Sequence, residues 1–163
     1  MKRVLVIHFS QSGQLAEIVQ SVCAPLRASS DIALTTALIR PRRPFPFPWP
    51  FWRFFDTFPE TVYADASAAP IEPLDLPDDA EFDLIVLAYQ VWFLSPSLPT
   101  TAFLQSEQAA RLLRGKPVVT LIGCRNMWLL AQEIVKENLQ QLGARLVDNA
   151  VLTDSCHSAF TFI

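Results

Sequence analysis

The sequence is poor in glycine, cysteine and histidine, and these shortages exclude several kinds of site. Its 163 residues include 4 glycines, 3 cysteines and 2 histidines. No Gly-x-Gly-x-x-Gly or Gly-x-x-x-x-Gly-Lys pattern occurs, which excludes a Rossmann dinucleotide loop and a Walker phosphate loop. No Cys-x-x-Cys or His-Glu-x-x-His pattern occurs either, so we expect no metal site, and the scattered Cys23, Cys124 and Cys156 indicate free thiols.

Long apolar runs and an excess of positive charge are also missing. Hydrophobic residues make up 51% of the chain, but no apolar run approaches the roughly 18 to 20 residues of a membrane-spanning helix. The basic residues 1–3 precede an apolar stretch too short for a signal peptide, so we expect a cytoplasmic protein. A formal net charge of −3 disfavours nucleic acid as a partner. Electron carriers use a strongly acidic face to steer toward their redox partners. The mild acidity of this chain therefore disfavours a pure electron carrier.

The most informative segment that is present runs from residue 4 to residue 20. An apolar stretch leads into a short polar loop, and apolar side chains then recur at helical spacing. The first N–H groups of a helix lack partners within the helix, and the helix dipole favours negative charge there. The segment therefore predicts a phosphate-binding loop, made of Ser10, Gln11, Ser12, Gly13, Gln14 and Leu15. The alternative is an ordinary strand-to-helix turn in which Ser12 caps the helix and no ligand binds.

Strands and helices alternate along the rest of the chain. Apolar runs predict strands at residues 3–9, 32–39, 83–89, 118–123 and 146–152. Helical spacing predicts helices at residues 13–27, 101–113 and 127–142. This alternation predicts one α/β domain over residues 1–163, a doubly wound parallel sheet of five strands in the order 2-1-3-4-5. Ligands of such sheets bind at the carboxyl ends of strands one, three and four.

The loop after the third predicted strand is strongly apolar. An exposed Trp92-Phe93-Leu94 run is costly in water unless something covers it. A flavin ring stacked on Trp92 or Phe93 would cover it, and the alternative is that both rings pack under a proline-rich segment. The candidate ligand residues of this loop are Gln90, Val91, Trp92, Phe93, Leu94 and Ser95.

The loop after the fourth predicted strand reads G-C-R-N-M-W over residues 123–128. Gly123 permits close backbone approach, and Arg125 would place positive charge near the pyrimidine edge of a flavin. Asn126 would bond to that edge or, more simply, cap the following helix, and Trp128 completes the candidate set. Cys124 precedes a helix N-terminus, which would lower the pKa of its thiol, but a buried structural thiol is the simpler interpretation.

Residues 40–81 form an insertion that this fold does not require. Its first half alternates proline with Phe and Trp, which predicts a polyproline II segment followed by a short helix at 51–58. Residues 64–79, rich in Ala, Pro and Asp, predict an exposed connection. The aromatic part would either cover the ligand crevice as an apolar lid or form an interaction surface, and we expect a homo-oligomer.

Four stretches of the chain together resemble one family. They are V-L-V-I-H-F-S-Q-S-G-Q-L, P-F-P-F-P-W-P-F-W, Y-Q-V-W-F-L-S-P-S-L-P and L-I-G-C-R-N-M-W. They resemble the flavodoxin-like proteins known as dialkylresorcinol condensing enzymes or aromatases. The resemblance implies a flavodoxin-like fold, FMN as cofactor, an apolar cyclic dione as substrate and a ketosynthase as partner. It implies oxidative aromatisation of a cyclohexanedione, which removes two electrons and two protons.

Three other functions stay open on the sequence. The first is quinone reduction or electron transfer on the same fold, and the second is a flavin-free scaffold for a ketosynthase. The third is a cofactor-free condensation by Cys124. No residue is identified as a general base, and His8 is expected to be a satisfied core histidine. Only residues 155–163 follow Asp154, so we expect no clear final helix, and one face of the sheet would be bare or covered by the insertion or a partner.

Overall fold

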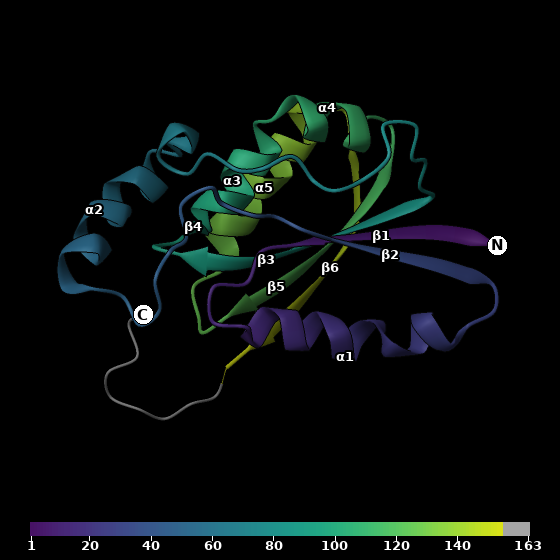
Figure 1. Cartoon of the computed structure of the whole chain (residues 1–163), viewed down its shortest axis with the longest axis horizontal. Coiled ribbons are helices and arrows are strands. Elements are labelled where there is room, and N and C mark those ends of the chain that lie inside the picture. The colour runs from purple at the N-terminus through teal and green to yellow at the C-terminus, as the bar shows by residue number, and fades with distance from the viewer. Residues whose placement is uncertain (155–163) are drawn as a thin grey trace.

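A parallel β-sheet forms the centre of the computed structural model, which describes residues 1–154 (Figure 1). Its parallel strands are β1 Lys2–His8, β2 Ile32–Leu38, β3 Leu84–Trp92, β5 Pro117–Cys124 and β6 Arg145–Thr153. They lie in the order β2-β1-β3-β5-β6, which is the predicted order of the parallel strands. The sheet differs from the prediction in detail, because a short strand, β4 Ser95–Pro96, pairs antiparallel with the end of β3.

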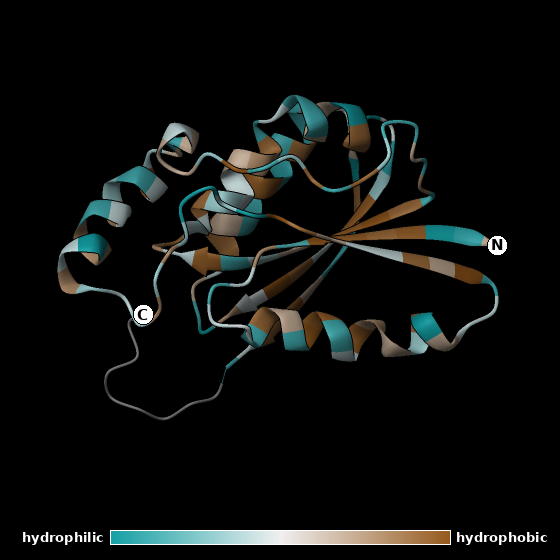
Figure 2. Cartoon of the chain, in the orientation of Figure 1, coloured by the Kyte–Doolittle hydropathy of each residue, from teal (hydrophilic) through white to brown (hydrophobic). Residues whose placement is uncertain are grey.

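The central strands are buried on both faces, which explains their continuous apolar sequences. Val4, Leu5, Val6 and Ile7 of β1 are all at most 4% exposed. Because successive side chains point to opposite faces, Val6 packs with one core cluster while Leu5 and Ile7 pack with the other. Figure 2 shows these strands as the most hydrophobic part of the molecule.

Helices cover the sheet on both faces (Figure 1). Helix α1 Gln14–Ala28 lies on one face and buries Leu15, Val19 and Cys23 against it. Helices α3 Leu98–Leu104, α4 Glu107–Leu113 and α5 Leu129–Gln141 lie on the other face over the larger core cluster. The expectation that no final helix follows β6 concerns residues 155–163, which lie outside the described residues.

The helix predicted at 101–113 is two helices, α3 and α4. Ser106 separates them, because its hydroxyl donates to the carbonyl of Phe103 at 2.6 Å and accepts from the N–H of Ala109 at 3.1 Å. The second bond is a typical N-cap of α4. A serine at this position therefore ends one helix and begins the next, although the apolar spacing continues across it.

The insertion contains the predicted helix, which begins at Phe51 as expected and continues further, as α2 Phe51–Val62. A 3₁₀ turn, η1 Ala66–Ala68, follows it. The expectation that residues 64–79 are exposed is wrong in part, because Ala69 and Leu74 are 2% and 3% exposed. Gln108 explains the burial of Leu74: its side-chain amide accepts from the Leu74 N–H at 2.7 Å and donates to the Leu74 carbonyl at 3.1 Å.

Within residues 1–154, no helix is both long enough and apolar enough to cross a membrane. The same residues contain no group of three His, Cys, Asp or Glu side chains placed to hold a metal ion.

Candidate functional site

The three predicted loops meet at one cavity on the carboxyl edge of the sheet. Its volume is about 430 Å³, within the range of small-molecule sites. Most of the predicted residues line it: Gln11, Ser12, Gln14, Leu15, Gln90, Val91, Trp92, Phe93, Leu94, Gly123, Arg125 and Asn126. The predicted residues that do not line it are Ser10, Gly13, Ser95 and Trp128.

The loop between β1 and α1 has the features of an anion site. Gly13 is the N-cap of α1, with a φ of 91°, and no side chain caps the helix, so Ser12 does not have the capping role considered above. Within residues 1–154, the first N–H groups of α1 therefore have no side-chain partner at its N-terminus. The buried hydroxyl of Ser10 has no hydrogen-bond partner among the described residues, which is unusual for a buried polar atom and marks a place where a ligand oxygen fits.

Gln11 joins this loop to two other parts of the site. Its backbone N–H donates to the side-chain carbonyl of Gln90 at 3.2 Å, at the end of β3. Its side-chain amide donates to the carbonyl of Pro46 at 2.9 Å, in the insertion. The insertion is therefore attached directly to the anion loop, and Phe47 and Trp49 line the cavity beside it.

The rings of the second loop pack against the insertion. Trp92 is 8% exposed and makes edge-to-face contacts with Phe45 and Trp49, at centroid distances of 5.2 and 5.1 Å. Phe93 contacts Phe54 of α2 at 4.9 Å. Both rings therefore pack against the insertion, and both residues also line the cavity.

The segment predicted as a loop after the third strand is largely a hairpin. β3 continues to Trp92, Phe93 and Leu94 form the turn with φ values of 49° and 68°, and β4 returns alongside. A two-residue turn with both φ values positive normally contains Asn or Gly, so the two bulky side chains here occupy a sparsely populated conformation. Ser95 lies in β4 and is buried, which explains why it does not line the cavity.

The third loop forms the remaining wall, with details that differ from those predicted. A Cβ on Gly123 would lie 3.0 Å from Cδ1 of Leu15, so the glycine allows α1 to approach β5 closely. Asn126 does not cap α5: its side chain accepts from the N–H of Met127 at 2.9 Å, and α5 begins only at Leu129. Arg125 is exposed and lines the cavity.

Burial governs the ionisable groups near the site. It raises the pKa of the Cys124 thiol, which lines the cavity, and this direction is opposite to the lowering considered for a helix N-terminus. It also raises the pKa of Tyr89, whose hydroxyl donates to the side-chain carbonyl of Gln132 at 2.7 Å. His8 is 7% exposed and burial lowers its pKa. Its Nδ1 has no partner among the described residues, so His8 is a core histidine but not a satisfied one.

Several lining residues were not among the predicted ligand residues. They are Ile18, Phe47, Trp49, Cys124, Met127, Leu152, Thr153 and Asp154. Those at the end of β6 follow from topology, since β6 lies beside β5 and the Asp154 N–H donates to the Cys124 carbonyl at 2.9 Å. Phe47 and Trp49 lie more than thirty residues from each predicted loop in the sequence, and only their aromatic composition gave a signal.

Comparison with known proteins finds structural neighbours only. No family model matches the chain, and no curated protein matches it. A flavoprotein from Lactobacillus acidophilus in complex with FMN is 17% identical over 93% of both chains, with a TM-score of 0.71. The apo form of the flavoprotein from that organism is 18% identical over 95% of this chain and 94% of its own, with a TM-score of 0.61. Oxidised flavodoxin 1 from Bacillus cereus is 16% identical over 94% of this chain and 87% of its own, with a TM-score of 0.54. These likenesses show that the chain has a flavodoxin-like fold.

Proposed function

We propose that the protein binds FMN in the cavity at the carboxyl edge of its flavodoxin-like sheet and acts as an oxidoreductase. The observation that carries this proposal is the position of the anion loop: the Ser10 hydroxyl, which has no partner within residues 1–154, and the N-terminus of α1 lie next to a cavity with both polar and aromatic lining. The Lactobacillus acidophilus flavoprotein, which has the same fold, is a complex with FMN.

The residues present fit a flat apolar group that carries one phosphate. The Ser10 hydroxyl and the first N–H groups of α1 would bind phosphate oxygens, and Gly13 leaves open space there, since a Cβ built on it meets nothing within 4 Å. The exposed parts of Trp49, Trp92 and Phe93 supply apolar contact area for a ring. Arg125, which also lines the cavity, supplies a positive charge.

FMN, when bound, supplies two-electron redox chemistry. The chain's own residues hold, orient and shield what binds. Gln11 fixes the anion loop against the end of β3 and against the insertion through its two hydrogen bonds. Trp92, with Phe45 and Trp49 packed on it, closes one side of the cavity to water. Such exclusion of water strengthens the electrostatic contact of a charge such as Arg125 with a bound group.

The substrate we propose is an apolar cyclohexanedione, which the protein would aromatise oxidatively in dialkylresorcinol biosynthesis after a ketosynthase has formed it. The aromatic insertion beside the cavity supports this, because its rings would bury an alkyl chain. The sequence resemblance to dialkylresorcinol condensing enzymes or aromatases supports it as well. A quinone would use the same apolar wall, so quinone reduction is the second activity to assay.

The first test is a titration of FMN with purified protein, followed by flavin fluorescence at neutral pH. We expect the protein to quench the fluorescence of FMN as it binds. We also expect it to bind FMN more tightly than riboflavin, which has the same ring but no phosphate. Ser10→Ala should weaken FMN and leave riboflavin unchanged, whereas Ser29→Ala, at the far end of α1, should change neither. No quenching at about 100 µM protein, a concentration at which even micromolar binding saturates, would contradict the proposal. Assays with a 5-alkylcyclohexane-1,3-dione and a quinone then separate the two activities.

A further inference from the structure

Helix α2 buries polar residues and exposes aromatic ones, the reverse of an ordinary surface helix. Such helices place their apolar stripe on the core and their polar residues in water. In α2 the buried residues are Thr57 and Thr61, at 0% and 1% exposure. The outward side carries an aromatic face with these exposures: Phe51 67%, Trp52 77%, Phe55 54%, Phe58 50%, Val62 44% and, at the C-cap, Tyr63 82%.

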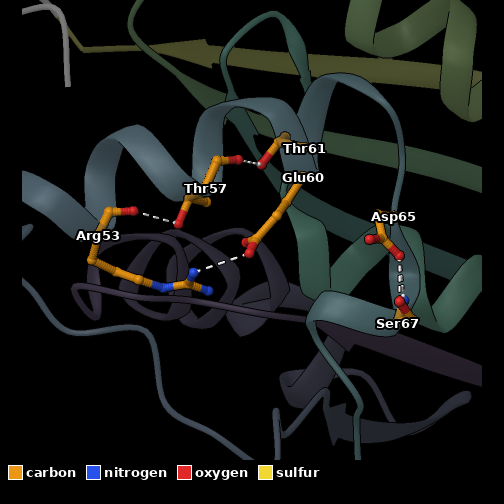
Figure 3. A network of polar contacts seen from close by, with 6 residues as sticks. All are labelled: Arg53, Thr57, Glu60, Thr61, Asp65 and Ser67. Carbon is orange, nitrogen blue, oxygen red and sulfur yellow. Dashed lines mark hydrogen bonds and ion pairs between the residues drawn. The ribbon is translucent and has the colours of Figure 1, made fainter.

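Polar contacts join the residues of α2 to one another, and a single ring contact links them to the segment before the helix (Figure 3). The hydroxyls of Thr57 and Thr61 donate to the carbonyls of Arg53 and Thr57, at 2.8 and 2.7 Å. The Arg53 guanidinium pairs with the carboxylate of Glu60 at 3.1 Å and stacks over the ring of Phe45 at 5.3 Å. Rotation of α2 to bury its aromatic face would break the contact between Arg53 and Phe45, whereas the ion pair and the two hydroxyl bonds join residues of α2 to one another and would move with the helix.

The hairpin turn holds α2 along one edge. Phe54 and Phe58 both contact Phe93, at centroid distances of 4.9 and 5.1 Å. The helix is therefore anchored on two sides, and its aromatic face is a fixed feature of the folded chain. In Figure 1 α2 stands at the end of the molecule, beyond β4, where this face is accessible to another molecule.

The size of the aromatic face matches a stable protein contact. An aromatic side chain offers about 150–250 Å² of surface, so at the observed exposures the face presents roughly 550–900 Å². A standard interface buries about 800 Å² on each partner. In monomers, the largest exposed apolar patch is typically only about 300–600 Å².

The charges around the face select its occupant. Helices that lie on membrane surfaces carry Lys and Arg on their polar side, but the one basic residue of α2, Arg53, points inward and is paired with Glu60. At 100° per residue, Asp56 lies at the rim of the stripe centred on Phe55 and Val62. A second copy of the chain presents the same uncharged aromatic face, which a two-fold axis can place against itself.

We propose that two copies of the protein pair through the aromatic face of α2. This inference does not depend on the proposed flavin chemistry, and its test needs no ligand.

Sedimentation velocity over a range of concentrations tests the pairing. We expect the wild-type chain to sediment with twice its 18.3 kDa mass. Phe55→Lys places a charge in the centre of the face and should raise the dimer dissociation constant about 30-fold or more. Trp52→Ser, at a position 77% exposed, is a milder change that should weaken pairing in the same direction. The matched control is Val22→Lys, at a position 47% exposed on α1, which should dimerise like the wild type.

Circular dichroism and the thermal midpoint, measured for each variant, show whether it folds. A wild-type chain that stays monomeric at the highest concentration contradicts the proposal. A folded Phe55→Lys chain that dimerises like the wild type contradicts it as well. Binding of a monomeric wild-type chain to neutral phosphatidylcholine vesicles would overturn it in favour of a membrane surface.

Discussion

The buried hydroxyl of Tyr89 gives the sharpest prediction for stability. Tyr89 is 0% exposed, and its hydroxyl donates to the side-chain carbonyl of Gln132 at 2.7 Å, across the interface between β3 and α5. Thr120 also contacts this amide, but its hydroxyl lies 3.3 Å from the same oxygen. Tyr89→Phe removes the shorter bond and leaves a buried carbonyl with the longer one alone.

We expect Tyr89→Phe to lower the free energy of unfolding by about 0.5–1.5 kcal/mol, the net contribution of one hydrogen bond, because Thr120 still contacts the carbonyl. For a chain of this size that corresponds to a fall in Tm of roughly 1–6 °C. Urea denaturation followed by circular dichroism measures the change. Tyr63→Phe is the matched control, because Tyr63 is 82% exposed and its substitution should change stability by less than about 0.5 kcal/mol.

The same tyrosine should make stability depend on alkaline pH. Burial raises the pKa of Tyr89 in the folded chain above the value of about 10 that it has when unfolded. Above pH ~10 the unfolded chain therefore releases a proton that the folded chain keeps, and the free energy of unfolding falls as pH rises. Tyr89→Phe should reduce this slope relative to Tyr63→Phe. Equal stabilities and equal alkaline slopes for the two variants would refute the reasoning.

Two further predictions concern the attachment of the insertion to α4 and the loop between β1 and α1. Gln108→Ala should lower the free energy of unfolding by about 1–3 kcal/mol, because it removes the partners of both backbone groups of the buried Leu74. Urea denaturation measures this loss, with Gln141→Ala at an exposed position as the control. A loss no greater than that of the control would contradict the prediction. Gly13→Ala should lower the free energy of unfolding by about 1–2 kcal/mol through backbone strain alone, since φ is 91° and a Cβ meets nothing within 4 Å. Asparagine tolerates this conformation better than alanine, so Gly13→Asn should be the less destabilising variant in the same assay. The reverse order would refute the strain argument.

Much of the architecture could be predicted because it depends on local patterns. Continuous apolar runs such as residues 4–7 indicate strands buried on both faces, and a doubly wound sheet then brings three named loops to one edge. The cavity lies at that edge, lined by most of the predicted residues.

What the sequence could not predict depends on contacts between distant residues. Phe93 and Leu94 have none of the Asn or Gly that marks a two-residue hairpin, so the turn is determined by its surroundings. The partners of Trp92 come from residues 45 and 49, and no pattern within either segment indicates that pairing. Asn126 was misassigned because its amide bonds to the next residue, which its position before a helix does not reveal.

Phe93 gives the cavity and α2 a common wall. Phe93 lines the cavity, and its ring contacts Phe54 and Phe58 of α2. If a bound molecule displaced this ring, the contacts of the ring with α2 would change. In the same way, a shift of α2 would change the shape of the cavity. Thermodynamic linkage then requires the effect to be reciprocal: a ligand that tightens an association through α2 is itself bound more tightly by the associated form, by the same factor.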